Sequence, residues 1–159
     1  MAERVAAFCS HIIEYSFYTL FFFVPLIFTA QNFELFEFNK MILAYLLTII
    51  IVGAFLIQSV AKRQFRIVRT PLDIPLLLFL VALCVSTIYS IDPHTSIWGY
   101  YSRFNGGLAS ILCYVFLYFV FVSTFGLRGS PSKMVRRLLL VSLASGFIVI
   151  LWGLPSHFG

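Results

Sequence analysis

Long uncharged stretches alternate with short charged ones along the whole chain. No Asp, Glu, Lys or Arg occurs in five windows, which are residues 15–33, 41–61, 74–91, 104–127 and 138–159. Each window is long enough to cross about 30 Å of hydrocarbon at about 1.5 Å per helical residue. The windows are also longer and more evenly apolar than the strands of membrane β-barrels, which run to about 10 residues. The pattern therefore predicts helices that span a membrane.

The expected fold class is all-α, a polytopic membrane helix bundle with five transmembrane helices in a single transmembrane region, residues 1–159. We place the helices at about 10–31, 41–61, 72–91, 107–127 and 137–155, with a short interfacial helix at about 93–104. The first window is interpreted as a retained anchor rather than a signal peptide, because its core is bulky and aromatic and the nearest cleavage-like site is poor.

Composition and charge agree with a membrane protein. Hydrophobic residues make up 61% of the 159 residues and charged residues only 11%, whereas about a quarter of a soluble domain is charged. The net charge of +5 arises mainly from two connections on one side of the predicted bundle, which with Arg4 hold nine of the eleven Lys and Arg residues. The positive-inside rule assigns that side to the cytoplasm. The predicted N-terminus is therefore cytoplasmic and the C-terminus outside, and the basic residues are expected to face membrane lipids rather than nucleic acid.

Several polar residues near helix ends fit structural roles. Thr70 is expected to cap the third helix, with Pro71 as its first residue and Asp73 in its first turn. His11 and Glu14 are three residues apart and are expected to form a pair at the membrane interface. The cysteines have no metal-ligand spacing and are expected to be packing residues: Cys9, Cys84 and Cys113.

The stretch SIDPHTSIWGYYSRFNGG, residues 90–107, crowds polar, aromatic and turn-forming residues between two apolar windows. Asp92 and Pro93 have the form of a helix N-cap and first residue, and the NGG at 105–107 has the form of a stop. An amphipathic helix lying in the outer interface is predicted between them. Its apolar face would hold Ile97, Tyr100, Tyr101 and Phe104.

Arg103 is the one basic residue of this stretch, and two interpretations of it stay open. In the first it is an interface anchor that reaches lipid phosphates. In the second its guanidinium lies over the outer mouth of the bundle and binds a pyrophosphate bidentately, while Tyr100 and Tyr101 pack on a sugar or lipid. Its isolation on an otherwise acidic side favours the second.

Three features of the second half of the chain occur together: a Pro-Leu-Asp entry to a helix, an outer SxDPxxSxxGYYxRxxGGL segment, and a closing WGLPSHFG. In these features the chain, above all TPLDIPLLLFLVALCVSTIYSIDPHTSIWGYYSRFNGGL at 70–108, resembles the amino-terminal part of bacterial O-antigen ligase and O-antigen polymerase family proteins. The resemblance implies a glycosyltransferase that transfers glycan from an undecaprenyl-pyrophosphate carrier to an acceptor outside the bacterial cytoplasmic membrane.

The resemblance also implies where the chemistry lies. The family's catalytic arginines and histidine occur mostly in a later outer loop, so no catalytic residue is assigned in this chain. We expect the chain to be the N-terminal part of a larger protein and inactive alone. No metal or other cofactor is expected, since the lipid pyrophosphate is the leaving group. The expected partner of the chain is a polyprenyl-pyrophosphate-linked glycan. The residues expected to bind this substrate are Arg103, Tyr100, Tyr101 and Asn105.

The alternative hypothesis is a non-enzymatic small membrane subunit or a transporter fragment. Ion-coupled transport usually requires a charged residue at mid-membrane depth. The middle of each predicted span lacks one, so the glycosyltransferase interpretation is preferred.

Overall fold

The computed structural model describes residues 2–27, 36–65, 67–100, 103–125 and 133–158. Every regular element within these ranges is a helix. The helices are α1 (Ala2–Leu26), α2 (Phe36–Ala61), α3 (Asp73–Ile88), α4 (Pro93–Trp98), α5 (Leu108–Phe125) and α6 (Lys133–Phe158). The all-helical prediction is confirmed for this part of the chain.

Four of these helices are long and apolar enough to cross a membrane: α1, α2, α5 and α6. They indicate a multi-pass membrane protein. The prediction of five such spans is not met, because α3 has 16 residues, or about 24 Å at 1.5 Å per residue. The remaining differences lie mostly at helix ends, since α1 and α2 begin before the predicted 10 and 41, ahead of their uncharged windows, and α1 ends at Leu26 rather than at 31.

The start of α3 explains part of its shortness. The predicted cap at Thr70 is wrong, since Pro71 and Leu72 form a turn and α3 begins at Asp73. The Asp73 carboxylate accepts hydrogen bonds from the Thr70 backbone N–H at 2.9 Å and from its hydroxyl at 2.7 Å. The Thr70 hydroxyl also contacts the hydroxyl of Tyr118 in α5. This cluster therefore ties the α3 start to α5.

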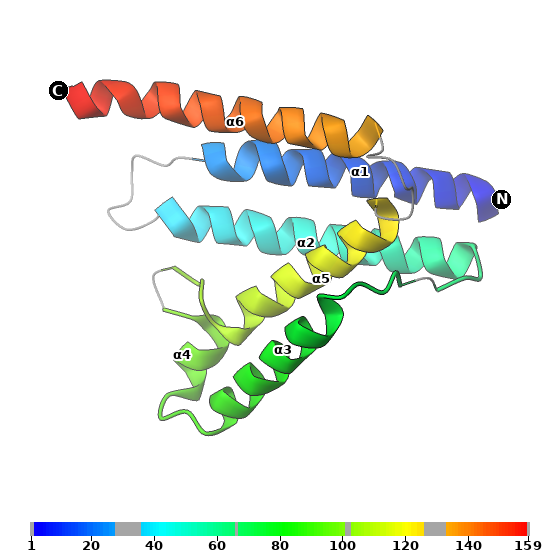
Figure 1. Ribbon diagram of the computed structural model, residues 1–159, viewed down its shortest axis with the longest axis horizontal. Coiled ribbons are helices and arrows are strands. Elements are labelled where there is room, and N and C mark those ends of the chain that lie inside the picture. The colour runs from blue at the N-terminus through cyan, green and yellow to red at the C-terminus, as the bar shows by residue number, and fades with distance from the viewer. Residues whose placement is uncertain (1, 28–35, 66, 101–102, 126–132, 159) are drawn as a thin grey trace.

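The helices pack in the order α6, α1, α2, α5, α3, with α4 against α3 and α5 (Figure 1). α1, α3 and α6 run in one general direction along the bundle, and α2 and α5 return (Figure 1). α3 and α5 lie as an inclined pair beside the layer formed by α6, α1 and α2.

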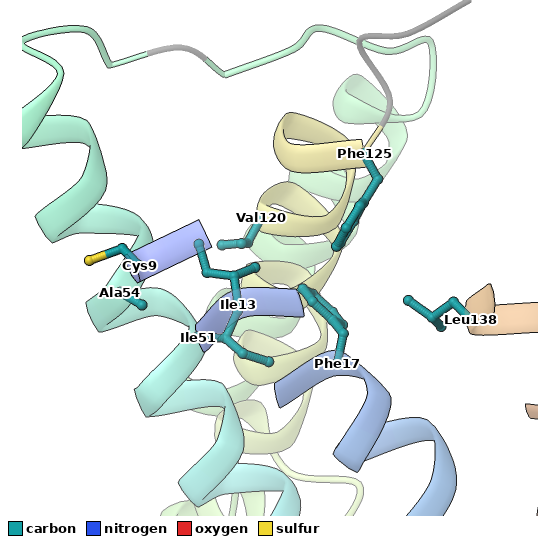
Figure 2. Close-up of a cluster of buried hydrophobic side chains, with 8 residues drawn as sticks. All are labelled: Cys9, Ile13, Phe17, Ile51, Ala54, Val120, Phe125 and Leu138. Carbon is teal, nitrogen blue, oxygen red and sulfur yellow. The ribbon is translucent and has the colours of Figure 1, made fainter. Parts of the chain in front are cut away.

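The core lies where α1, α2, α5 and α6 meet (Figure 2). In α1 and α2 its apolar side chains recur every three or four residues, so these two helices each place them on one face. Phe17 of α1 is 2% exposed, and its ring meets those of Phe121 and Phe125 edge to face, with centroids 5.6 and 5.5 Å apart. The cluster consists of Cys9, Ile13, Phe17, Ile51, Ala54, Val120, Phe125 and Leu138.

Hydrogen bonds between side chains and backbone also link the helices. The Gln58 side-chain amide of α2 donates to the Ala6 carbonyl of α1 at 3.2 Å and contacts the Ser10 hydroxyl. The buried Ser145 hydroxyl of α6 donates to the Phe22 carbonyl of α1 at 2.8 Å. In a membrane, where apolar surface alone does not drive helix association, such bonds and close packing hold helices together.

Replacing Phe17 with alanine tests the core. We expect Phe17→Ala to lower the stability of the bundle by about 3 kcal/mol, because the ring contacts between α1 and α5 are lost and a cavity remains. Thermal unfolding in detergent measures the change. The matched control is Phe8→Ala, on the same helix but 66% exposed, which should leave the midpoint nearly unchanged. An equal effect of both substitutions would contradict this assignment of the core.

Candidate functional site

Basic residues gather at one end of the bundle. That end holds the start of α1, the connection from α2 to α3, and the start of α6 (Figure 1). The described basic residues within these segments are Arg4, Lys62, Arg63, Arg69, Lys133, Arg136 and Arg137. The opposite end holds the start of α2, α4 and the start of α5, with Lys40 and Arg103 as its described Lys and Arg residues. The candidate site lies at this second end.

Helix α4 begins as predicted but is half the predicted length. Asp92 is its N-cap, and one carboxylate oxygen accepts from the backbone N–H groups of His94 at 3.1 Å and Thr95 at 3.3 Å. The hydrogen bond from the Thr95 hydroxyl, with those from the backbone, lowers the pKa of Asp92 below its usual 3.8. The helix ends at Trp98 rather than at 104, so the predicted continuous apolar face does not form.

Two glycines close the connection from α4 to α5. Gly99 has φ of +83°, a left-handed conformation that favours glycine. A Cβ atom on Gly99 would lie 2.2 Å from the Asn105 carbonyl oxygen, and one on Gly107 would lie 2.3 Å from the Gly99 nitrogen. The backbone at 105–107 therefore packs directly on the end of α4, and only residues without a side chain fit. Gly99, not the NGG at 105–107, terminates the helix.

Arg103 lies in the α4–α5 connection, on the turn that the contact between Gly99 and Gly107 closes. The backbone N–H groups of Arg103 and Phe104 both donate to the Tyr100 carbonyl at 2.9 Å. Phe104 has φ of +49°, which is uncommon for a residue with a large side chain. The Tyr45 hydroxyl of α2 donates to the Phe104 carbonyl at 2.8 Å, and the Phe104 ring meets Phe38 with centroids 5.4 Å apart.

The side chain of Arg103 extends toward water beside a carboxylate. It is 61% exposed, and its Nε atom lies 3.8 Å from Oε2 of Glu37, itself 47% exposed. That separation is too long for a hydrogen bond. Exposed ion pairs of this kind contribute about 0–1 kcal/mol, so the contact holds the guanidinium only weakly.

The other predicted substrate-binding residues differ in position. Tyr100 is exposed next to the turn, whereas Tyr101 lies outside the described residues. The Asn105 side-chain carbonyl accepts from the Gly106 N–H at 2.8 Å and from the Tyr114 hydroxyl at 3.3 Å. Asn105 therefore contributes to the fold of the turn through this oxygen.

Sequence reasoning missed the residues of α2 that contact this turn. Glu37 and Phe38 lie between two predicted helices, and Tyr45 lies within the uncharged window 41–61, so none of them was predicted to contact the turn. Phe38 and Tyr45 are seven residues apart, which is compatible with one side of a helix, but this spacing does not show that the turn lies against that side.

Glu14, in the middle of α1, is a further correction. It is only 8% exposed, and its carboxylate accepts from the Tyr18 hydroxyl at 2.7 Å. Arg137 of α6 lies close enough to interact with Tyr18. Glu14 is thus buried between helices and bonded to Tyr18, whereas His11 packs near the Tyr15 ring. The predicted interfacial pair is wrong.

Cysteine and metal-ligand geometry adds no second site. Cys9, Cys84 and Cys113 are free thiols, and Cys9 is buried in the core. Within the described ranges, no group of three or more His, Cys, Asp or Glu side chains could hold a metal ion.

Comparisons with known proteins find no relative. No family model matches the chain, and neither does any curated protein or solved structure. The geometry around Arg103 therefore carries the functional proposal without support from a relative.

The close approach of Gly107 to Gly99 can be tested by adding one methyl group. Gly107→Ala should destabilise the bundle by about 1–3 kcal/mol, because the new carbon overlaps backbone atoms that are held by the end of α4. Limited proteolysis should then cut the α4–α5 connection faster, and the thermal midpoint should fall. Gly53→Ala in α2 is the control, since nothing lies within 4 Å of its added carbon. Equal behaviour of the two variants would refute the backbone contact.

Proposed function

We propose that the chain is the N-terminal membrane portion of a glycosyltransferase that transfers glycan from an undecaprenyl-pyrophosphate carrier to an acceptor outside the bacterial cytoplasmic membrane. The O-antigen ligases and polymerases that the outer segment resembles act in this way. The observation that carries the proposal is Arg103, an exposed guanidinium on a tightly closed turn at the less basic end of the bundle.

The chemistry of the reaction suits such a cation. The acceptor hydroxyl loses its proton to a base, and its oxygen bonds to the anomeric carbon of the glycan. The bond from that carbon to the pyrophosphate breaks, and the carrier pyrophosphate leaves with the electron pair. An arginine can bind this anion through two parallel N–H donors. Arg103 is proposed as a binding residue, and no catalytic base is assigned in the chain.

The surroundings of Arg103 favour a ligand that is part lipid and part sugar. Trp98 and Tyr100 have exposed rings beside the turn, and aromatic residues of this kind prefer the level of lipid headgroups. Sugars also pack against aromatic faces. The first turn of α2 places the exposed carboxylate of Glu37 beside Arg103. The pyrophosphate must therefore compete with this carboxylate for the guanidinium.

The proposed orientation places the basic end in the cytoplasm, by the positive-inside rule. α2 ends at the basic end and α5 begins at the opposite one (Figure 1), and this arrangement supports α3 as the helix that returns the chain across the membrane. We propose that α3 is the fifth crossing, with a locally thinned bilayer matching its 16 residues. The N-terminus is then cytoplasmic and the C-terminus outside.

Cysteine labelling tests this orientation. In a variant without the three native cysteines, Ser90→Cys should react with a membrane-impermeant maleimide in intact cells, because residue 90 follows α3 on the outer side. Gln64→Cys, in the connection that precedes α3, should react only after the cells are permeabilised. Equal labelling of both sites in intact cells would rule out α3 as a crossing.

Binding of the carrier tests the function itself. With the purified chain in lipid nanodiscs, Arg103→Lys should weaken binding of undecaprenyl pyrophosphate about 10-fold or more, because a point charge lacks the planar pair of donors. Arg103→Ala should weaken it further. Lys40→Ala removes a positive charge from the same end of the bundle and should have little effect.

Two results would contradict the proposal. Wild-type affinity in Arg103→Lys would show that Arg103 does not bind the pyrophosphate through two parallel N–H donors of its guanidinium. Failure of the wild-type chain to bind the carrier at all would favour a non-enzymatic membrane subunit.

A further inference from the structure

One side of α2 contacts the turn that carries Arg103. Phe38, Met41 and Tyr45 recur at spacings of three and four residues, which places them along one side of a helix. Glu37 lies beside the Arg103 side chain, and Phe38 packs on the Phe104 ring. Met41 accepts from the Tyr114 hydroxyl at 3.4 Å, and that hydroxyl also reaches Asn105. The three residues 103–105 thus rest on α2 and α5.

Tyr45 makes a side-chain hydrogen bond from α2 to the backbone of this turn. It joins residues that are 59 positions apart, with an oxygen–oxygen distance of 2.8 Å. The acceptor is the carbonyl of Phe104, which directly follows Arg103 and has a positive φ. A large residue keeps such a conformation only when its surroundings hold it there. Tyr45 and Phe38 supply two of those contacts.

The guanidinium needs this support if it is to bind an anion bidentately. A binding group must be held within about 0.5 Å of its productive position by side chains that are themselves fixed. The ion pair with Glu37 is too long and too exposed to do this. The half-buried hydroxyl of Tyr45 acts one residue away, on the backbone from which Arg103 extends.

We infer that Tyr45 is a positioning residue for Arg103: its hydroxyl fixes the Phe104 carbonyl and so sets the direction in which the guanidinium faces the pyrophosphate. The inference rests on the proposed function for its ligand. The hydrogen bond itself can be tested without any ligand.

Tyr45→Phe is the informative variant, because it removes the hydroxyl and keeps the ring. Hydrogen–deuterium exchange of a peptide covering 103–107 in nanodiscs should become about five-fold faster, since local opening of the turn becomes easier. Binding of undecaprenyl pyrophosphate should weaken about three- to ten-fold, as expected for loss of one hydrogen bond that pre-organises the site. The control is Tyr15→Phe, which removes an exposed tyrosine hydroxyl from α1 and should change neither quantity.

A double-mutant cycle separates positioning from general support of the fold. In an Arg103→Ala background, Tyr45→Phe should cause no further loss of carrier binding, because the group that it positions is gone. The faster exchange should persist there. An additional loss equal to that in the wild-type background would overturn the positioning role.

The remaining outcomes are equally decisive. Unchanged exchange in Tyr45→Phe, or faster exchange with unchanged carrier binding, would overturn the inference. If the wild-type chain does not bind the carrier, the proposed function fails by itself. Faster exchange in Tyr45→Phe would then still support Tyr45 as the residue that holds the Arg103 turn, and unchanged exchange would overturn this as well.

Discussion

The packing of α2 against α1 is the contact on which the rest of the structure depends. α1 carries α6 on its other side, and α2 carries α5, which in turn carries α3 and α4. In a bilayer the apolar faces of helices gain little from leaving lipid, so close approach and polar bonds must hold this pair. Ala6 and Ala54 allow that approach, and Gln58 links the two helices by hydrogen bonds. A helix pair fixed in this way gives the outer helices a defined surface to pack on.

The position of α2 has a consequence at the far end of the bundle. Because α1 and α5 fix α2, the first turns of α2 provide a rigid edge at the level of the α4–α5 connection (Figure 1). The connection is closed on itself by the contact between Gly99 and Gly107, and it is attached to α2 through Tyr45. A loop closed only by its own backbone contact could still pivot as a unit. The hydrogen bond from Tyr45 of α2 opposes this pivoting, and it therefore fixes the position of the Arg103 backbone relative to the packed helices.

The sequence predicts the helices well because hydrocarbon excludes charge, and the uncharged windows mark where the chain can cross it. It predicts helix ends poorly, because a helix can extend past its uncharged window, as α1 does by beginning at Ala2. The apolar spacing after Asp92 predicted a longer α4, since periodicity cannot show that Gly99 turns into a left-handed conformation against Asn105. Arg103 could be chosen from the sequence because it is isolated. Tyr45 could not, since its partner Phe104 is 59 residues away and becomes a neighbour only when α2 and α5 pack.

The weakness of the contact between Glu37 and Arg103 is compatible with the proposed binding of an anion at Arg103. A buried ion pair would oppose any competing anion, because separating two desolvated charges leaves both without compensation. Here both side chains are about half exposed, and the closest nitrogen–oxygen distance is 3.8 Å, so water and salt already screen the attraction. Replacing the single carboxylate by a pyrophosphate, which has more charge and more acceptor oxygens, would therefore cost little. The carboxylate attracts the cation only weakly, while the hydrogen bond from Tyr45 holds the backbone from which the Arg103 side chain extends.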